Sequence, residues 1–142
     1  SLSLPLPRWA RMLTLVLGIA ACAVPLSLYD GTTYQTLTDL KVDATLLVGS
    51  FDSVAVKENA PAISGTRVRF LKALEYEKGK GKENHDTADQ LELLLTLYDQ
   101  VVADYRASGP NPRLRDYRER AVQLGQAFDT AIATEAAKNR EK

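Results

Sequence analysis

The sequence predicts an all-α protein: an N-terminal membrane or signal helix followed by an antiparallel, up-down helical bundle of about four helices. Residues 12–29 form an apolar run without a charged side chain. In the segments that follow, apolar residues recur at steps of three and four, and none alternates as a strand would. We therefore expect two parts, a signal segment or transmembrane anchor at 1–29 and a helical bundle at 30–142, long enough to fold alone.

Charges around the apolar run predict its orientation. Arg8 and Arg11 precede the run, whereas Asp30 follows it. Positive residues remain on the cytoplasmic side of a membrane segment. We therefore expect the bundle to lie across the membrane from the cytoplasm, in the periplasm of a bacterial cell envelope.

The apolar run has three interpretations. As an uncleaved anchor, its 18 residues are at the short end of a bilayer span, with Trp9 and Tyr29 at the two interfaces. As a lipoprotein signal, the segment Ile-Ala-Ala-Cys at 19–22 resembles a lipobox and makes Cys22 the lipidation site, although the run stays apolar after it. As an ordinary signal peptide, it would be cut after Ala21 or Ala23. We favour the anchor.

Capping and periodicity predict the first two helices. Thr32 and Gln35 have the spacing of a capping box at the start of the first. After an aperiodic stretch at 53–60, Pro61 suits the first turn of the second helix, and Gly79 suits its end. The apolar face of the first helix is predicted at Tyr34, Leu37, Leu40, Ala44, Leu47 and Phe51.

The third and fourth helices follow from similar signals. The third is expected from Asp86 or Thr87 and has the strongest apolar stripe, which includes Leu94. Asn111 is expected to cap the fourth helix, with Pro112 in its first turn. From Thr134 onward the chain is polar, and we expect it to fray. No internal repeat of fixed period is evident.

Composition argues against most chemistries. The chain has 18 basic and 18 acidic residues, so we expect no nucleic-acid partner. Its single cysteine is Cys22 and its single histidine is His85. Acidic residues surround His85 near the predicted turn between helices two and three, but they match neither a calcium loop nor a di-iron motif. We expect no enzyme activity, catalytic residue, cofactor or metal.

One glycine-rich turn is the best candidate for binding a partner. Tyr76, Lys78, Lys80 and Lys82 lie together there, and Tyr76 falls outside the predicted apolar stripe. Loops on rigid scaffolds often carry function, and tyrosine is enriched at interfaces. The alternative is a solvated turn without a partner.

Two segments carry a resemblance to known proteins. YDGTTYQTLTDLK at 29–41 and EYEKGKGKENHDTADQLELL at 75–94 resemble small uncharacterised bacterial envelope proteins of the lipoprotein type. The resemblance implies an envelope location and a helical domain. It implies no catalytic or binding residues.

These observations favour a function by contact. We expect a non-enzymatic, membrane-tethered helical protein that is an accessory or scaffold subunit of an envelope or membrane protein complex. Its partners would be membrane lipid and other envelope or membrane protein subunits. The alternative is a free-standing periplasmic lipoprotein that binds a small ligand or the cell wall.

Overall fold

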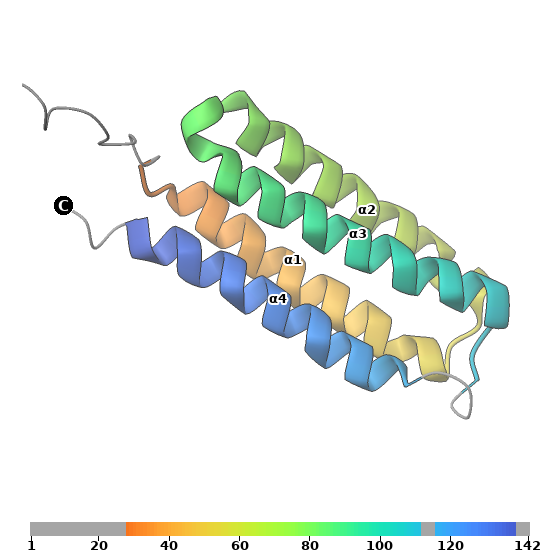
Figure 1. The fold of residues 1–142 in the computed structure, drawn as a ribbon. Helices are drawn as coiled ribbons and strands as arrows, with labels where there is room; N and C mark the ends of the chain where they lie inside the picture. Colours follow the sequence, from red (N-terminus) through yellow and green to blue (C-terminus); the bar gives the residue numbers. More distant parts are fainter. Residues whose placement is uncertain (1–27, 112–115, 139–142) are drawn as a thin grey trace, which may run out of the picture.

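The computed structural model describes residues 28–111 and 116–138. They form four α-helices in an antiparallel bundle (Figure 1), and no strand occurs in these two ranges. The predicted all-α bundle of about four helices is therefore confirmed for this part of the chain. The elements are α1 (Gly31–Gly49), η2 (Ser50–Asp52), α2 (Val56–Gly79), η3 (Lys82–Asn84), α3 (His85–Ser108) and α4 (Tyr117–Ala137).

The predicted N-terminal helix lies almost wholly outside the described residues, and so does Cys22. Among the helices that are described, none combines the length and the apolar character that crossing a bilayer requires.

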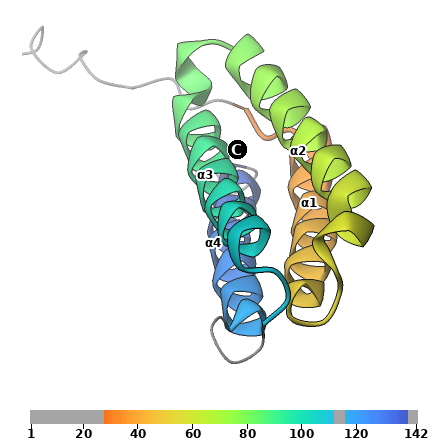
Figure 2. The same cartoon turned by 90° about the vertical axis from the view of Figure 1, so that its right-hand side faces the viewer.

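The four helices surround one core. α1 and α3 each pack against both α2 and α4, and α1 and α3 lie diagonally across the bundle (Figure 2). The start of α1, the end of α4 and the turn between α2 and α3 lie at the same end of the bundle (Figure 1). This end is therefore also where the chain enters from residues 1–27.

Aromatic rings fill the opposite end of the core. The Phe51 and Tyr105 rings stack with centroids 3.9 Å apart and planes within 2° of parallel. The edge of Tyr117 meets both rings, at 5.8 and 5.9 Å. All three side chains are fully buried, so they contribute a large share of the apolar surface removed from water.

The buried face of α1 and η2 repeats in α3 at a distance of 54 positions. In each of the seven pairs that this distance relates, both residues are buried. The counterparts are Thr33 and Thr87, Leu37 and Leu91, Leu40 and Leu94, Ala44 and Tyr98, Leu47 and Val101, Val48 and Val102, and Phe51 and Tyr105.

α2 repeats in α4 at a distance of 58 positions. The residues of the seven pairs that this distance relates are buried, except Ile132, Lys80 and Lys138, which are partly buried. The counterparts are Ile63 and Ala121, Thr66 and Leu124, Phe70 and Phe128, Ala73 and Ala131, Leu74 and Ile132, Glu77 and Glu135, and Lys80 and Lys138.

The bundle is therefore two copies of a helical hairpin related by an approximate two-fold axis. Residues near such an axis contact their own counterparts, as Phe51 does with Tyr105 and Phe70 with Phe128, whose centroids are 5.8 Å apart. Between aligned positions, the stretch from Tyr105 to Ala121 is four residues longer than the stretch from Phe51 to Ile63. A search for one fixed period misses the repeat because this insertion changes the spacing.

Two predicted helix starts shift in the structure. The N-cap of α1 is Asp30, whose carboxylate accepts a hydrogen bond from the Thr32 N–H at 2.8 Å. The buried face of α1 therefore begins at Thr33, which is 1% exposed, whereas Tyr34 is 39% exposed. α2 begins five residues before Pro61 because the Asn59 amide ties its start to the Ser50 and Tyr105 hydroxyls, at 3.0 and 3.2 Å.

The last helix also differs from its prediction. Asp116, not Asn111, caps α4 by accepting from the Glu119 N–H at 3.0 Å, and Pro112 lies outside the described residues. Beyond Thr134 the helix continues to Ala137. The expectation of a frayed tail there was wrong because Glu135 is fully buried among polar partners.

Candidate functional site

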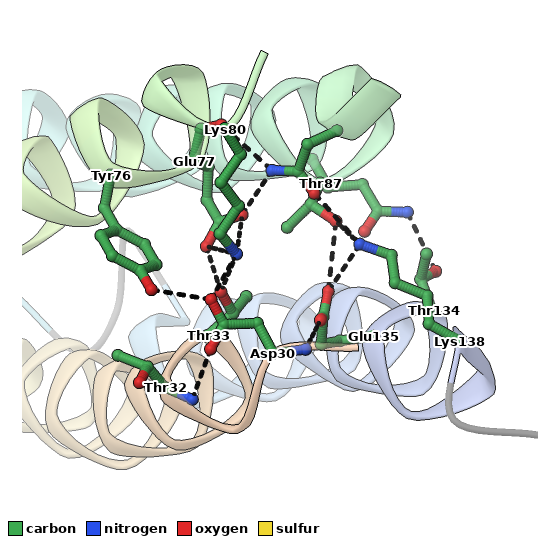
Figure 3. A network of polar contacts seen from close by, with 12 residues as sticks. Asp30, Thr32, Thr33, Tyr76, Glu77, Lys80, Thr87, Thr134, Glu135 and Lys138 are labelled. Carbon is green, nitrogen blue, oxygen red and sulfur yellow. Dashed lines mark hydrogen bonds and ion pairs between the residues drawn. The ribbon is translucent and has the colours of Figure 1, made fainter. Parts of the chain in front are cut away.

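A network of polar side chains occupies the end of the bundle where the described chain begins and ends (Figure 3). We call it the end network. It consists of two clusters of the same kind, one in each copy of the hairpin: Asp30, Thr33, Glu77 and Lys80 in the first, and Asn84, Thr87, Glu135 and Lys138 in the second.

The first cluster is built around Glu77, which is 2% exposed. The Thr33 hydroxyl donates a hydrogen bond to the Glu77 carboxylate. The Lys80 ammonium donates to the Thr33 hydroxyl at 2.6 Å and to Glu77 Oε2 at 3.0 Å. It also forms an ion pair with Asp30 Oδ2 at 2.8 Å. One cation thus serves two carboxylates and a hydroxyl.

The second cluster repeats this arrangement around Glu135, which is fully buried. The Lys138 ammonium donates to Glu135 Oε2 at 2.8 Å, to the Thr87 hydroxyl at 2.9 Å and to Asn84 Oδ1 at 3.1 Å. The Thr87 hydroxyl donates to the same carboxylate oxygen at 3.4 Å. Asn84 takes the place that Asp30 has in the first cluster.

Three hydrogen bonds join the clusters across the approximate axis. The Asp30 backbone N–H donates to Glu135 Oε1 at 2.8 Å. The Asn84 side-chain amide donates to the Glu77 carboxylate and, at 3.1 Å, to the Glu77 carbonyl. All four helices are therefore linked at this end.

The positions of these residues explain why buried carboxylates are tolerated here. Glu77 and Glu135 lie in the last turns of α2 and α4, where the helix dipole disfavours negative charge. Burying an ion is costly unless partners replace its water. The lysine one turn further along and the threonine in the first turn of the neighbouring helix supply those partners.

The charges of the first cluster shift three pKa values. The pKa of Asp30 lies well below its usual value, mainly because its carboxylate accepts a hydrogen bond from Lys80. Hydrogen bonds from Tyr76 and the Thr32 N–H lower this pKa further. Donating to Asp30 raises the pKa of Tyr76. Burial lowers the pKa of Lys80, but its bonds to Asp30 and Glu77 outweigh burial and raise it overall. Asp30 and Lys80 are thus charged at neutral pH.

The structure separates the four residues predicted to bind a partner. The Tyr76 hydroxyl donates to Asp30 at 2.7 Å, and the Lys80 ammonium lies 4.8 Å from the centroid of its ring. Lys78 instead pairs with Glu92 of α3 at 2.6 Å. Lys82 is exposed in η3. Tyr76 and Lys80 therefore lie together, whereas Lys78 faces the α3 side of α2.

The acidic residues near His85 do not form a cluster in the described part of the chain that could hold a metal ion. His85 is exposed, and its ring contacts Asp86 at 2.9 Å and the Lys82 carbonyl at 3.0 Å. These contacts place His85 at the surface of the bundle.

A groove between α1 and α2 extends from the end network along the bundle. Its volume is about 330 Å³. Sequence reasoning missed it because its lining comes from helices whose apolar stripes look ordinary. We call it the α1–α2 groove; buried Leu37, Leu40, Ala73 and Leu91 line its floor, and Thr36, Asp39, Arg69, Lys72 and Tyr76 line its rim.

Comparison of the chain with known protein families, with curated proteins and with solved structures finds no match.

Proposed function

We propose that this chain is a non-enzymatic, membrane-tethered helical protein that is an accessory or scaffold subunit of a bacterial envelope or membrane protein complex. Residues 12–29 contact membrane lipid, and the bundle lies in the periplasm. Other envelope or membrane protein subunits bind the bundle. This proposal agrees with the resemblance to envelope proteins of the lipoprotein type.

The observation that supports this proposal most is the attachment of Asp30. This residue directly follows the predicted anchor, and it is bonded to α2 through Lys80 and Tyr76 and to α4 through Glu135. The residue directly after the predicted anchor is thus tied to two helices of the bundle. We infer that this junction limits the movement of the bundle relative to the membrane, which would favour docking of a partner subunit.

The first test asks whether membrane attachment of the chain requires Cys22. Cys22→Ser leaves the full chain in the membrane fraction if the apolar run itself is the anchor. Lipidation at Cys22 would instead release or misprocess this variant. An intact mass that shows a chain beginning at Cys22 with added acyl groups would overturn the anchor in favour of the lipoprotein.

The partner surface is proposed at the turn between α2 and α3. Tyr76, Lys78 and Lys82 present exposed side chains around this turn, Tyr76 on the α1 side of α2 and Lys78 on its α3 side. Lys80 lies against the Tyr76 ring from within the end network. In the described ranges Lys82 has no ion pair, so its charge is free for a partner.

Co-purification tests this surface. Tagged full chain would be purified from solubilised membranes, and its partners quantified by mass spectrometry. A triple variant with alanine at Tyr76, Lys78 and Lys82 is expected to lose partners while keeping its helical content. Lys57→Ala, an exposed lysine near the other end of α2, is the matched control. Equal partner recovery from the triple variant and the control would refute the surface.

The α1–α2 groove favours a second candidate function, the binding of a small ligand in the periplasm. Sites for small molecules are concave, mostly apolar and carry a few placed polar groups. The groove has these properties. Saturable binding of a small molecule that a groove-filling substitution abolishes would support this candidate.

A further inference from the structure

We propose that the α1–α2 groove binds a small zwitterion with an apolar side chain, of the α-amino acid class. The inference rests on the second candidate function and names its ligand class.

The size and floor of the groove fit one apolar side chain. Its volume of about 330 Å³ is near the lower bound of small-molecule sites, roughly 300–1,000 Å³. Leu37, Leu40 and Ala73 on its floor are buried, at 0%, 2% and 7% exposed. A side chain of aliphatic or aromatic character would bury apolar area against them.

The two copies of the hairpin share this floor but differ at the rim. The floor residues Leu37, Leu40 and Ala73 correspond to side chains of the same type in the second copy, Leu91, Leu94 and Ala131. At the rim, the second copy has Gln90 and Thr134 in place of Thr36 and Tyr76. Gln90 Nε2 donates to the Thr134 hydroxyl at 3.1 Å and joins α3 to α4 there.

The charges of Asp39 and Lys72 at the rim have no equivalent in the second copy. Asp39 and Lys72 line the groove, and their counterparts are the uncharged Leu93 and Thr130. The repeat needs neither charge to fold, because the second copy folds without them. Their presence beside an apolar floor points to recognition of a charged ligand.

The two charges are unpaired in the described structure. Arg69, the other cation of the groove, pairs with Asp43, and Glu77 pairs with Lys80. Within the described ranges, Asp39 and Lys72 form no ion pair. An anion on α1 and a cation on α2 thus face one groove without neutralising each other.

A zwitterion satisfies both charges at once. Its ammonium pairs with Asp39 and its carboxylate with Lys72, while its side chain lies on the apolar floor. A purely anionic ligand would meet repulsion from Asp39, and a purely cationic one would meet it from Lys72. Because both side chains are exposed, each pair is weak, and we expect a Kd of about 1 mM.

Four probes of one shape test the charge requirement. The full chain in lipid nanodiscs would be titrated with L-phenylalanine and followed by NMR chemical shifts of the groove residues. L-phenylalaninamide lacks the carboxylate, N-acetyl-L-phenylalanine lacks the ammonium, and 2-phenylethanol lacks both. We expect L-phenylalanine to bind about two- to fivefold more tightly than either singly charged probe, because the loss of one exposed ion pair costs at most about 1 kcal/mol.

Variants locate the binding in the groove. Asp39→Ala is expected to weaken L-phenylalanine and its amide but not the N-acetyl probe, and Lys72→Ala to weaken L-phenylalanine and the N-acetyl probe but not the amide. Thr36→Gln, which copies the rim residue of the second copy, is expected to abolish binding of every probe. Lys57→Ala is the matched control, and circular dichroism confirms the fold of each variant.

The outcomes separate the ligand class from ligand binding itself. If 2-phenylethanol binds as tightly as L-phenylalanine and Thr36→Gln blocks both, the groove binds ligands but the zwitterion proposal is wrong. If no probe shifts the NMR signals of groove residues at a concentration about ten times the expected Kd, both the zwitterion proposal and the second candidate function are wrong. Binding that survives Thr36→Gln would place the probe outside the groove and overturn the proposal.

Discussion

The α1–α4 and α2–α3 interfaces occupy equivalent places in the repeat, but they are built from different side chains. In α4, Gly125 lies against α1, where an added Cβ would be 3.5 Å from Thr45 Cγ2. The counterparts of these two residues are Arg67 and Asp99, which form a two-pronged ion pair between α2 and α3 at 3.0 to 3.3 Å.

This difference shows which parts of the hairpin the fold requires. Buried apolar positions and the Glu–Lys pairs occur in both copies, so the bundle depends on them. The interface rims, the α1–α2 groove and the cap residues Asp30 and Asn84 differ between copies. Specific properties of this protein should therefore be sought where the copies differ, and its stability where they agree.

The largest loss of stability is expected from breaking the Glu–Lys pair that occurs in both copies of the hairpin. Lys138→Met leaves Glu135, which is fully buried, without its cation. Removing one partner of a buried pair costs about 3–5 kcal/mol of unfolding free energy. Lys80→Met should cost less because Lys80 is 21% exposed and Lys138 only 10%. Urea denaturation monitored by circular dichroism measures both, and losses below about 1 kcal/mol would show that the end network is well solvated.

The second prediction tests whether the two hairpins contribute equally to the core. Leu40 and Leu94 are counterparts and are 2% and 1% exposed. Each substitution to alanine should lower the unfolding free energy by about 2–5 kcal/mol, because it leaves a cavity. The same denaturation experiment would give similar values for the pair if the copies pack alike. A near-zero cost for Leu94→Ala alone would mean that the second hairpin is not a core partner.

A third prediction makes the first cap resemble the second. Asp30→Asn copies Asn84 and removes the charge beside Lys80. Charged hydrogen bonds contribute about 1.5–3 kcal/mol, and since Asn still accepts a bond, we expect a loss of about 1–2 kcal/mol near pH 7.

The pH dependence of this loss follows from the lowered pKa of Asp30. A carboxylate with a lower pKa in the folded state stabilises the fold above its unfolded pKa of about 3.9. That contribution disappears as the pH falls toward the folded pKa. The stability difference between wild type and variant should therefore shrink below about pH 4. A constant difference across this range would contradict the role assigned to the Asp30 charge.

The smallest expected effect has the opposite sign. Gly125→Ala adds a methyl group at ordinary contact distance from Thr45. Alanine is favoured over glycine in a helix by about 0.5–1 kcal/mol, so the melting temperature should rise slightly. A decrease would mean that the α1–α4 interface has no room for the methyl group and that its closeness depends on glycine.

Most of the fold was readable from the sequence because apolar periodicity reports burial. Leu37, Leu40 and Leu94 lie in the core as predicted. The error at Thr33 and Tyr34 arose because a tyrosine reads as more apolar than the threonine beside it. The actual register was set by Asp30, whose role as N-cap starts the helix two residues earlier than an N-cap at Thr32 would.

The end network could not be read in the same way. Glu135 and Lys138 look like a solvated tail, and the N–H that binds Glu135 belongs to Asp30, 105 positions away. Only the repeat would have pointed to them, since Glu-x-x-Lys occurs at 77–80 and again at 135–138, each time at the end of a helix. The predicted set of Tyr76, Lys78, Lys80 and Lys82 placed attention near this end, but it did not show that Lys80 is committed to buried partners.

The joining of Asp30 to Glu135 also bears on the order in which the helices can be connected. In the repeat, Lys138 is the counterpart of Lys80, and Asp30 is the counterpart of Asn84. Lys138 and Asp30 are therefore placed relative to each other as Lys80 and Asn84 are, and only three residues connect Lys80 to Asn84. A similarly short linker from Lys138 to Asp30 would therefore close the described bundle into a ring. Cutting that ring in the turn at 81–83 gives a circular permutant with the same four helices in the order α3, α4, α1, α2. Its successful folding would show that the bundle has no obligatory first helix.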